Sequence, residues 1–527
     1  MKKAIHALTA ALVAMAMIIA GFVGVGSAFA EETGNTITIN NSAAGHTYEA
    51  YQIFTGTKDG DTLTNIAWGS NVSAGYQQER GDAAAFAATL TAANAEAMAR
   101  ELAGNLAGVP VATASEQSNG KYVLTVPASG YYLIRDKDGS QTNTSEAYTA
   151  YILKVAGNVE TNAKYDVPTL EKKVKENTKA DNETAYGQGY NDVADYHIGD
   201  TVPFSLFGTI PERRTDYPKY SYTFHDTYSA GLTFDENSVK VYLVDNDSET
   251  EGADVTSYFT VTADKTNHSF SVSCSDINAI EGIASGKKFR VNYTATLNSD
   301  AQIGLPGNPN GAWLTFSNNP NADYSGEQHP EGGETPKDYV IVFTYQLDST
   351  KVDNANPDKK LSGAKFKLQR DSDHKWAVVA NGRISGWADS EEEGTEVESS
   401  AEGTFGFTGL DAGGYKLKET AAPAGYKLPD APFAFTITAT TANGQNWKGS
   451  MKAESAATAL TKLEITSGTE TNEGDTSTGS VSLTVKNTSG SSLPETGGMG
   501  TIVLYVAGAA LIAAAGAYFL LRKKNAR

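Results

Sequence analysis

The sequence predicts a mainly β protein built from tandem β-sandwich domains, with a helical segment in the first domain, a signal peptide and a C-terminal transmembrane helix. The 527 residues allow about three domains. They include 51 Gly and 26 Tyr, distributed among short alternating apolar segments that favour strands and turns. The single cysteine excludes an intrachain disulfide, and the net charge of −20 argues against nucleic-acid binding.

The first 30 residues have the three parts of a secretory signal: a basic start, an apolar segment over residues 10–25 and small residues before a cleavage site. We expect residues 1–30 to be a signal peptide that is cleaved between Ala30 and Glu31. The alternative is a retained membrane anchor, which the small residues directly after the apolar segment disfavour. The chain is therefore expected to be exported.

The organisation between the two ends indicates three modules. The first, residues 31–163, opens with alternating strands and contains an Ala-rich helical stretch over residues 83–106. The second, residues 168–321, is followed by a linker rich in Gly, Pro and Glu. The third, residues 338–489, contains a polar stretch over residues 466–479 that we interpret as a long surface loop.

The C-terminal end predicts a membrane span. Residues 501–521 are uncharged, and a helix of this length spans about 32 Å. The tail over residues 522–527 carries four basic residues and would stay in the cytoplasm, so everything before residue 501 would lie outside the cell. Directly before the span are Leu493, Pro494, Glu495, Thr496 and Gly497.

These three parts resemble the cell-wall sorting signal of Gram-positive surface proteins. The resemblance implies that a sortase thiol attacks the bond between Thr496 and Gly497, and that the threonine carbonyl is then passed to an amine. The helix would be a transient tether. The alternative is a permanently anchored protein with a chance pentapeptide.

Strand parity in the third module places polar residues on apolar faces. Residues i and i+2 of a strand share a face, and Lys351, Glu419 and Asn487 each continue an apolar row. Burying an ammonium or a carboxylate without a partner costs several kcal/mol of folding free energy. The Lys351 and Glu419 side chains should therefore be neighbours. Burial also lowers the pKa of an amine and raises that of a carboxyl.

Two interpretations fit this triad. A neutral Lys351 amine can attack the carboxamide of Asn487, with Glu419 shuttling protons, to release ammonia and leave an isopeptide bond. The alternative is a buried ion pair with the asparagine as a hydrogen-bonding bystander. Parity alone slightly favours the ion pair.

A resemblance favours the isopeptide bond. Residues 415–426, Tyr-Lys-Leu-Lys-Glu-Thr-Ala-Ala-Pro-Ala-Gly-Tyr, resemble the E-box of collagen-adhesin B-type (Cna-B) domains in Gram-positive pilins. Residues 361–366 resemble the start of those domains. The resemblance implies immunoglobulin-like β-sandwiches, with Lys351 and Asn487 as the cross-linked pair and Glu419 as the catalytic residue.

The middle module repeats the pattern with an aspartate. The second predicted triad consists of Lys172, Asp226 and Asn318. Parity selects Lys172 over Lys173 and Asn318 over Asn319, although a β-bulge could reverse either choice. Residues 224–234 resemble the fimbrial isopeptide-forming domain of shaft pilins, which implies a second cross-link with Asp226 as its catalytic carboxyl.

A polymer needs an acceptor amine in addition to the Thr496 donor. In the resembling family this amine is a lysine between the first two domains. Lys164 has the expected position, but Ala163 stands where the family has proline. Lys219 lies in the usual Tyr-Pro-Lys string, inside the middle module. We choose Lys164 and keep Lys219 as the alternative.

The resemblance covers nearly the whole chain and implies the major shaft subunit of a sortase-assembled pilus (fimbria) on a Gram-positive cell wall. Implied partners are pilin-specific and housekeeping sortases, identical subunits joined head to tail, accessory tip and base pilins, peptidoglycan, and host glycans or matrix proteins. The runner-up is a monomeric wall-anchored adhesin whose first domain binds a host ligand.

A surface enzyme is the remaining class, and the sequence has no convergent catalytic set for it. We expect no chemistry of the chain's own beyond single-turnover self-cross-linking. The sequence contains neither a phosphate-binding loop nor zinc-ligand spacing, so we expect no cofactor and no metal.

Overall fold

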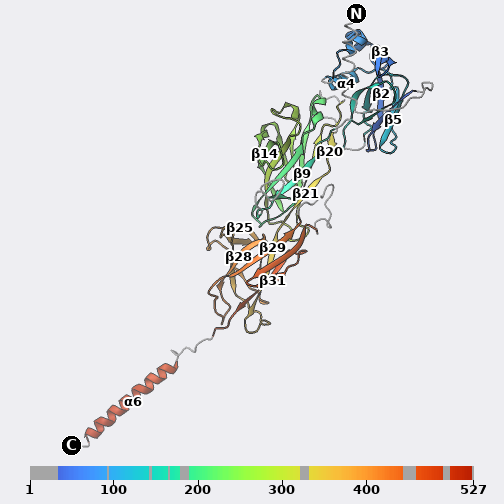
Figure 1. Ribbon diagram of the computed structural model, residues 1–527. Coiled ribbons are helices and arrows are strands. Elements are labelled where there is room, and N and C mark those ends of the chain that lie inside the picture. The colour runs from blue at the N-terminus through green and yellow to red at the C-terminus, as the bar shows by residue number, and fades with distance from the viewer. Residues whose placement is uncertain are drawn as a thin grey trace. The chain divides into compact units, whose positions relative to one another are not determined.

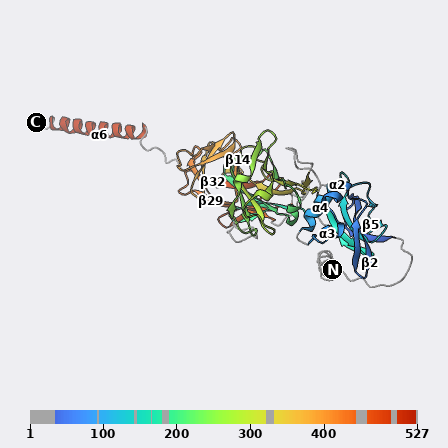
Figure 2. The same cartoon turned by 90° about the horizontal axis from the view of Figure 1, so that it is seen from above.

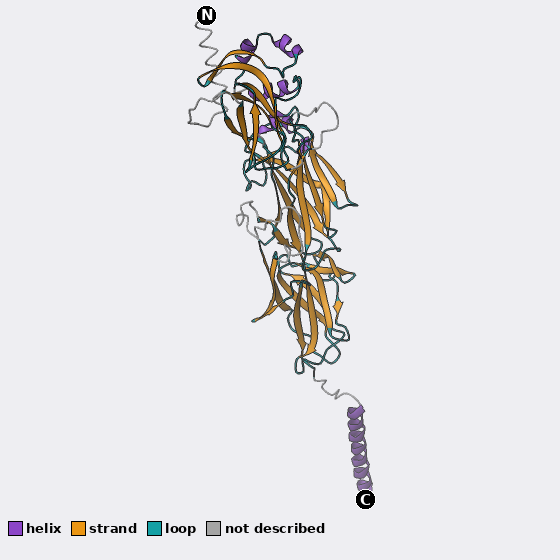
Figure 3. Cartoon of the chain, turned by 90° about the vertical axis from the view of Figure 1, so that its right-hand side faces the viewer, coloured by secondary structure: helices purple, strands orange, loops and turns teal. Residues whose placement is uncertain are grey.

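The computed structural model describes residues 34–91, 94–141, 145–163, 166–178, 189–320, 332–442, 458–490 and 499–524. They form two compact units (Figure 1). The first unit takes the described residues within Met1–Tyr196, Asp200–Phe343 and Thr441–Thr461, and the second takes those within His197–Gly199, Thr344–Thr440 and Lys462–Arg527. Within the described residues, α-helix occurs only in the first domain and at the C-terminal end (Figure 3), so the prediction of a mainly β chain is confirmed.

The first domain packs two sheets and three short helices around apolar cores. One sheet has the strand order β5-β1-β8, and the other has β3-β2-β6-β7 with β4 beside β2. The strands are β1 (Asn35–Asn40), β2 (Tyr48–Asp59), β3 (Thr62–Trp68), β4 (Ala112–Ala114), β5 (Lys121–Val126), β6 (Gly130–Asp136), β7 (Ala150–Val155) and β8 (Val159–Asn162). The helices α2 (Ala74–Arg80), α3 (Ala83–Ala87) and α4 (Ala95–Ala103) gather beside the second sheet (Figure 2).

The helical stretch predicted over residues 83–106 is interrupted between α3 and α4. Asp82 begins α3 as its N-cap and accepts a hydrogen bond from the Ala85 amide at 2.8 Å. In the interruption, Asn94 Oδ1 accepts from the Thr91 amide at 2.6 Å. Short polar side chains compete for backbone groups in this way, which is why an Ala-rich stretch breaks at them.

The middle domain is a sandwich of two sheets. Their strand orders are β10-β9-β12-β18-β14-β15 and β11-β21-β19-β13-β17-β16, with β20 beside β19. The strands of the first are β9 (Leu170–Lys175), β10 (Tyr190–Asn191), β12 (Thr201–Thr209), β14 (Leu232–Val244), β15 (Ala253–Asp254) and β18 (Lys288–Leu297). Those of the second are β11 (Val193–Asp195), β13 (Tyr222–Tyr228), β16 (Thr260–Asp264), β17 (Ser269–Cys274), β19 (Asn308–Phe316), β20 (Gly333–Glu334) and β21 (Asp338–Phe343).

The structure moves the boundary between the second and third modules from residue 338 to Thr344. The strand β21 pairs with β19 on one side and with β11 on the other, so it completes the middle domain rather than opening the third. The predicted linker also contributes β20. The apolar residues over 339–343 fit a strand of either domain, and only the pairing partner decides between them.

The third domain is also a sandwich. Its sheets have the orders β27-β22-β32 and β25-β24-β23-β28-β29-β30-β31, with β26 beside β23. The strands are β22 (Tyr345–Asp353), β23 (Lys365–Arg370), β24 (Trp376–Ala380), β25 (Arg383–Ala388), β26 (Val397–Glu398), β27 (Thr404–Leu410), β28 (Gly413–Ala421), β29 (Phe433–Thr441), β30 (Leu460–Ser467), β31 (Glu470–Glu473) and β32 (Ser480–Asn487). The stretch predicted as a loop over residues 466–479 contains an exposed hairpin, because β31 pairs with the end of β30.

The C-terminal helix α6 (Met499–Lys524) agrees with the predicted span at residues 501–521. Its segment Leu504–Lys523 is long and apolar enough to cross a membrane. The predicted signal peptide and its cleavage site at Ala30 and Glu31 lie outside the described residues.

The first domain contains a buried imidazole between two carboxylates. His46 Nδ1 lies 2.7 Å from Asp136 Oδ1, and Nε2 lies 2.6 Å from Glu146 Oε2. The His46 ring also stacks on that of Tyr48. Burial opposes the charged imidazolium, but the bonds to the two carboxylates outweigh it and raise the pKa of His46.

The raised pKa of His46 predicts that this contact stabilises the folded state at low pH. Its contribution to the free energy of unfolding is present below about pH 6.5 and is lost as the pH rises through the folded pKa. We expect His46→Gln to lower the thermal unfolding midpoint of the first domain by several degrees at about pH 5.5, and by less at about pH 8.5.

Calorimetry of the exported chain at both pH values measures this difference. The control is His374→Asn, because His374 is exposed and has a positive φ of 61° that asparagine tolerates. An equal loss at both pH values for His46→Gln would contradict the prediction.

Candidate cross-linking sites

The third domain brings its three predicted residues together in the core. Lys351 lies on β22 and Asn487 on the adjacent parallel strand β32, whereas Glu419 comes from β28 in the facing sheet. Lys351 Nζ donates to Glu419 Oε2 at 2.8 Å and also to Asn487 Oδ1. Asn487 Nδ2 donates to Glu419 Oε1 at 2.7 Å. The amine, the carboxyl and the carboxamide therefore form a closed ring of hydrogen bonds.

The surroundings of this triad exclude water. Lys351 is fully buried, and Glu419 and Asn487 are 5% and 2% exposed. The Lys351 ammonium lies 5.4 Å from the ring centroids of both Phe366 and Phe433. Burial lowers the pKa of Lys351, which favours the neutral amine that a nucleophile requires.

The middle domain also buries a lysine against a carboxyl. Lys172 on β9 donates to Asp226 Oδ2 on β13, and both side chains are fully buried. Burial lowers the pKa of Lys172 and raises the pKa of Asp226, and the attraction between the two charges opposes both shifts. The Lys172 backbone amide donates to Asp338 Oδ2 at 2.8 Å, which ties β9 to the start of β21.

Asn318 was expected to complete this triad, and that prediction is wrong. Asp226 pairs with Ala312 on β19, and Asn318 is six residues further along the chain, about 20 Å for an extended strand. The Asn318 side chain instead donates to the Glu146 carbonyl of the first domain at 3.2 Å. Parity identified the correct face of the strand but not the position along it.

The asparagine of β19 that lies beside Asp226 is Asn310, near the start of the strand. It is 1% exposed and has the same parity as Asn318. Tyr228 pairs with Asn310 across the sheet, so Asn310 and Asp226 are diagonal neighbours on one face. The whole buried row of β19 offers two amides, Asn308 and Asn310, and the register against the strand of Asp226 selects Asn310.

Tyr293 is a site residue that the sequence did not reveal. It lies on β18, where it alternates with buried aliphatic residues like an ordinary core tyrosine. Its hydroxyl accepts from Lys172 Nζ at 2.6 Å and from Asn310 Nδ2 at 2.8 Å, and donates to Asp226 Oδ2 at 2.9 Å. The phenol therefore joins the amine, the carboxyl and the carboxamide.

Two buried oxygens of the middle site have no hydrogen-bond partner among the described residues: Asp226 Oδ1 and Asn310 Oδ1. Two acceptors cannot satisfy each other unless one carries a proton. A proton on Asp226 Oδ1, aimed at Asn310 Oδ1, would satisfy both oxygens, and the raised pKa of Asp226 favours that state.

The structure describes only one of the two candidate acceptor lysines. Lys164 lies outside the described residues. Lys219 is exposed, in the loop between the 3₁₀ helix Glu212–Asp216 and β13. Asp166, two residues after Lys164, accepts from the Glu212 amide. The chain after Lys164 thus runs beside the segment that leads to Lys219.

The sorting motif, Leu493, Pro494, Glu495, Thr496 and Gly497, also lies outside the described residues.

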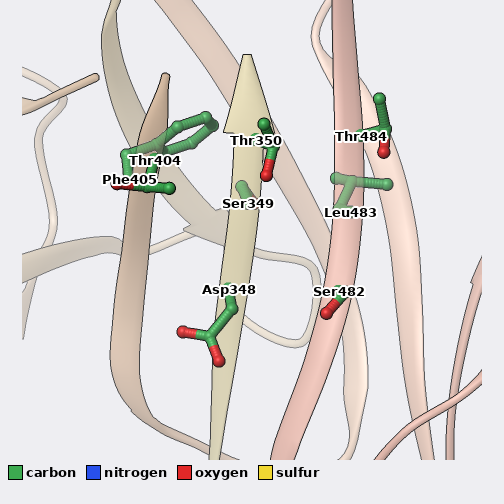
Figure 4. Close-up of a pocket in the computed structure, with 8 residues that line it drawn as sticks. All are labelled: Asp348, Ser349, Thr350, Thr404, Phe405, Ser482, Leu483 and Thr484. Carbon is green, nitrogen blue, oxygen red and sulfur yellow. The ribbon is translucent and has the colours of Figure 1, made fainter. Parts of the chain in front are cut away.

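A shallow cavity of about 410 Å³ lies on the third domain, and its lining includes none of the triad residues. Figure 4 shows its lining on three neighbouring strands, β27, β22 and β32. The lining is mostly hydroxyl-bearing, with Asp348 as its one ionisable residue. Neither triad contributes to it, so the candidate chemistry lies in closed cores rather than in an open pocket.

Three known protein families match separate segments of the chain. Residues 198–320 match the Gram-positive pilin backbone subunit 2, Cna-B-like domain. Residues 346–450 match the SpaA prealbumin-like fold domain, and residues 485–527 match the LPXTG cell wall anchor motif. The chain is therefore a cell-wall-anchored surface protein of the Gram-positive type, built from pilin domains, and the matched families are structural rather than enzymatic.

Individual relatives are pilins. The chain is 27% identical over 374 residues to the trypsin-resistant surface T6 protein of Streptococcus pyogenes serotype M6, a match that spans 62% of this chain and 65% of the T6 protein. The solved T6 backbone pilin of that serotype has a TM-score of 0.53 at 20% identity and covers 88% of this chain and 100% of its own, which supports the fold. The major pilin SpaD of Corynebacterium diphtheriae has a TM-score of 0.48 at 17% identity, covering 88% of this chain and 100% of its own.

Proposed function

We propose that the chain is the major shaft subunit of a covalently polymerised, sortase-assembled pilus and that two internal Lys-Asn isopeptide bonds stabilise it. The observation that carries the proposal is the burial of a lysine against a carboxyl in each of two successive sandwiches. A carboxamide contacts the lysine directly in the third domain and through the Tyr293 hydroxyl in the middle domain. The pilin backbone match and the wall anchor support the assembly into a fibre.

The cross-linking reaction follows from the contacts in the third domain. Neutral Lys351 Nζ attacks Cγ of Asn487, a new C–N bond forms, and the Cγ–Nδ2 bond breaks. One proton leaves Nζ and reaches Nδ2, which departs as ammonia. Glu419 contacts both nitrogens through its two oxygens and can carry this proton. The middle domain would join Lys172 to Asn310, in place of the expected Asn318.

Both bonds would close large loops. Lys351 and Asn487 are 136 residues apart, and Lys172 and Asn310 are 138 apart (310 minus 172). In the chain-entropy account of cross-links, closing a loop of this size stabilises the folded state by about 4–5 kcal/mol. The third-domain bond would join the first strand of its domain to the last. The middle-domain bond would end at β19, leaving β21 held by hydrogen bonds.

Intact mass tests both bonds. We expect the exported chain, Glu31–Thr496, to be lighter than its sequence by two ammonia molecules. Asn310→Ala and Asn487→Ala should each be lighter than their own sequences by one. Asn318→Ala is the matched control and should still lose two. A wild-type mass equal to the sequence would refute both bonds, and loss of a bond in Asn318→Ala would restore that residue to the site.

Polymerisation requires one acceptor lysine for Thr496. We propose that pilin-specific sortase joins Thr496 of one subunit to Lys164 of the next, with Lys219 as the alternative acceptor, and that a housekeeping sortase transfers the fibre to peptidoglycan. Accessory tip and base pilins would complete the fibre, which would support adhesion to host glycans or matrix proteins.

Boiled wall extracts distinguish the acceptors. We expect a ladder of covalent multimers on an immunoblot of the wild type and of Lys219→Arg, and a single wall-linked band for Lys164→Arg. Loss of the ladder only in Lys219→Arg would move the acceptor. A single band in all three strains would support the runner-up, a monomeric wall-anchored adhesin.

A further inference from the structure

The two candidate sites differ in how the carboxyl reaches the amide nitrogen that must leave. In the third domain, Glu419 contacts the amine with one oxygen and Asn487 Nδ2 with the other. In the middle domain, Asp226 Oδ2 contacts the amine, whereas Asn310 Nδ2 bonds to the Tyr293 hydroxyl. The aspartate side chain is one methylene shorter than glutamate, and the Tyr293 hydroxyl lies between Asp226 Oδ2 and Asn310 Nδ2.

Tyr293 therefore bonds to both ends of the required proton transfer. Isopeptide formation removes one proton from Lys172 Nζ and adds one to Asn310 Nδ2. The phenol oxygen lies 2.6 Å from the first nitrogen and 2.8 Å from the second. Its own proton points at Asp226 Oδ2, 2.9 Å away.

We propose that Tyr293 is a catalytic residue of the middle-domain cross-link and relays the proton from Lys172 to the departing nitrogen of Asn310. This inference rests on the proposed function. As Lys172 Nζ bonds to Cγ, it passes one proton to the phenol oxygen, the phenol passes its own to Asp226 Oδ2, and the proton already on Asp226 Oδ1 moves to the amide oxygen of Asn310. Each proton then moves back one step: the amide oxygen returns its proton to Asp226 Oδ1, Asp226 Oδ2 returns one to the phenol, and the phenol protonates Nδ2. The Cγ–Nδ2 bond breaks and ammonia leaves, with Tyr293 and Asp226 returned to their starting states.

The surroundings hold Tyr293 in this role. Its ring stacks on Phe204 at 5.1 Å and meets Phe270 edge-on at 4.9 Å, so packing fixes the direction of the hydroxyl. Burial raises the pKa of Tyr293 well above its usual value, which keeps the phenol protonated and able both to accept and to donate.

The test compares Tyr293→Phe with Phe204→Leu in the whole exported chain. Tyr293→Phe keeps the ring and removes only the hydroxyl, whereas Phe204→Leu disturbs the same packing and leaves the hydroxyl in place. The formation of each cross-link is followed by mass spectrometry of domain fragments from freshly synthesised protein. For Tyr293→Phe we expect the middle-domain bond to form about 100-fold more slowly or to be missing, and the third-domain bond to be complete.

The single cysteine provides a folding check. Cys274 lies on β17 of the middle domain, is 4% exposed and pairs with Tyr222 on β13. Cross-linking is scored only in molecules whose Cys274 resists a thiol reagent, so that unfolded chains do not enter the comparison.

The outcomes separate this inference from the proposed function. A slow or missing bond in Tyr293→Phe, together with normal bond formation in Phe204→Leu, would support the relay. Wild-type rates in Tyr293→Phe, or equal losses in both variants, would overturn the relay and leave the cross-link standing. A wild-type middle domain without ammonia loss would refute the cross-link itself.

Discussion

The burial of a lysine ammonium in the core of each sandwich is the constraint on which the rest of the structure depends. Lys172 and Lys351 are both fully buried, and a lone buried charge would cost more than a domain can tolerate. Each core therefore places a carboxyl beside the amine and surrounds the pair with aromatic rings. This arrangement, required for stability, is also the one that favours a neutral amine next to a carboxamide.

The two cores meet this constraint with different topologies. In the third domain the lysine and the asparagine lie on adjacent parallel strands, and the carboxyl comes from the facing sheet. In the middle domain the lysine lies in one sheet, and the aspartate and asparagine lie together in the other. In the middle domain the amine must therefore reach the amide across the core rather than along one sheet, and the Tyr293 hydroxyl contacts both groups.

The first domain shows that buried charge can also be held without a reactive lysine. There His46 contacts two carboxylates, and Glu146, one of them, offers its backbone carbonyl to Asn318 of the middle domain. The residue expected to form a cross-link thus joins two domains of one unit by hydrogen bonds.

The sequence by itself determined the mainly β class, the span at the C-terminal end and the complete third-domain triad, because alternation defines which residues of a strand face the core. It also predicted that Lys172 and Asp226 meet in the core of the middle domain. Only the tertiary structure decided for Asn310 over Asn318, added Tyr293, broke the Ala-rich helix and assigned Asp338–Phe343 to the middle domain. Parity defines a face, but the position along the strand and the choice of partner depend on pairing register, which contacts between distant segments set.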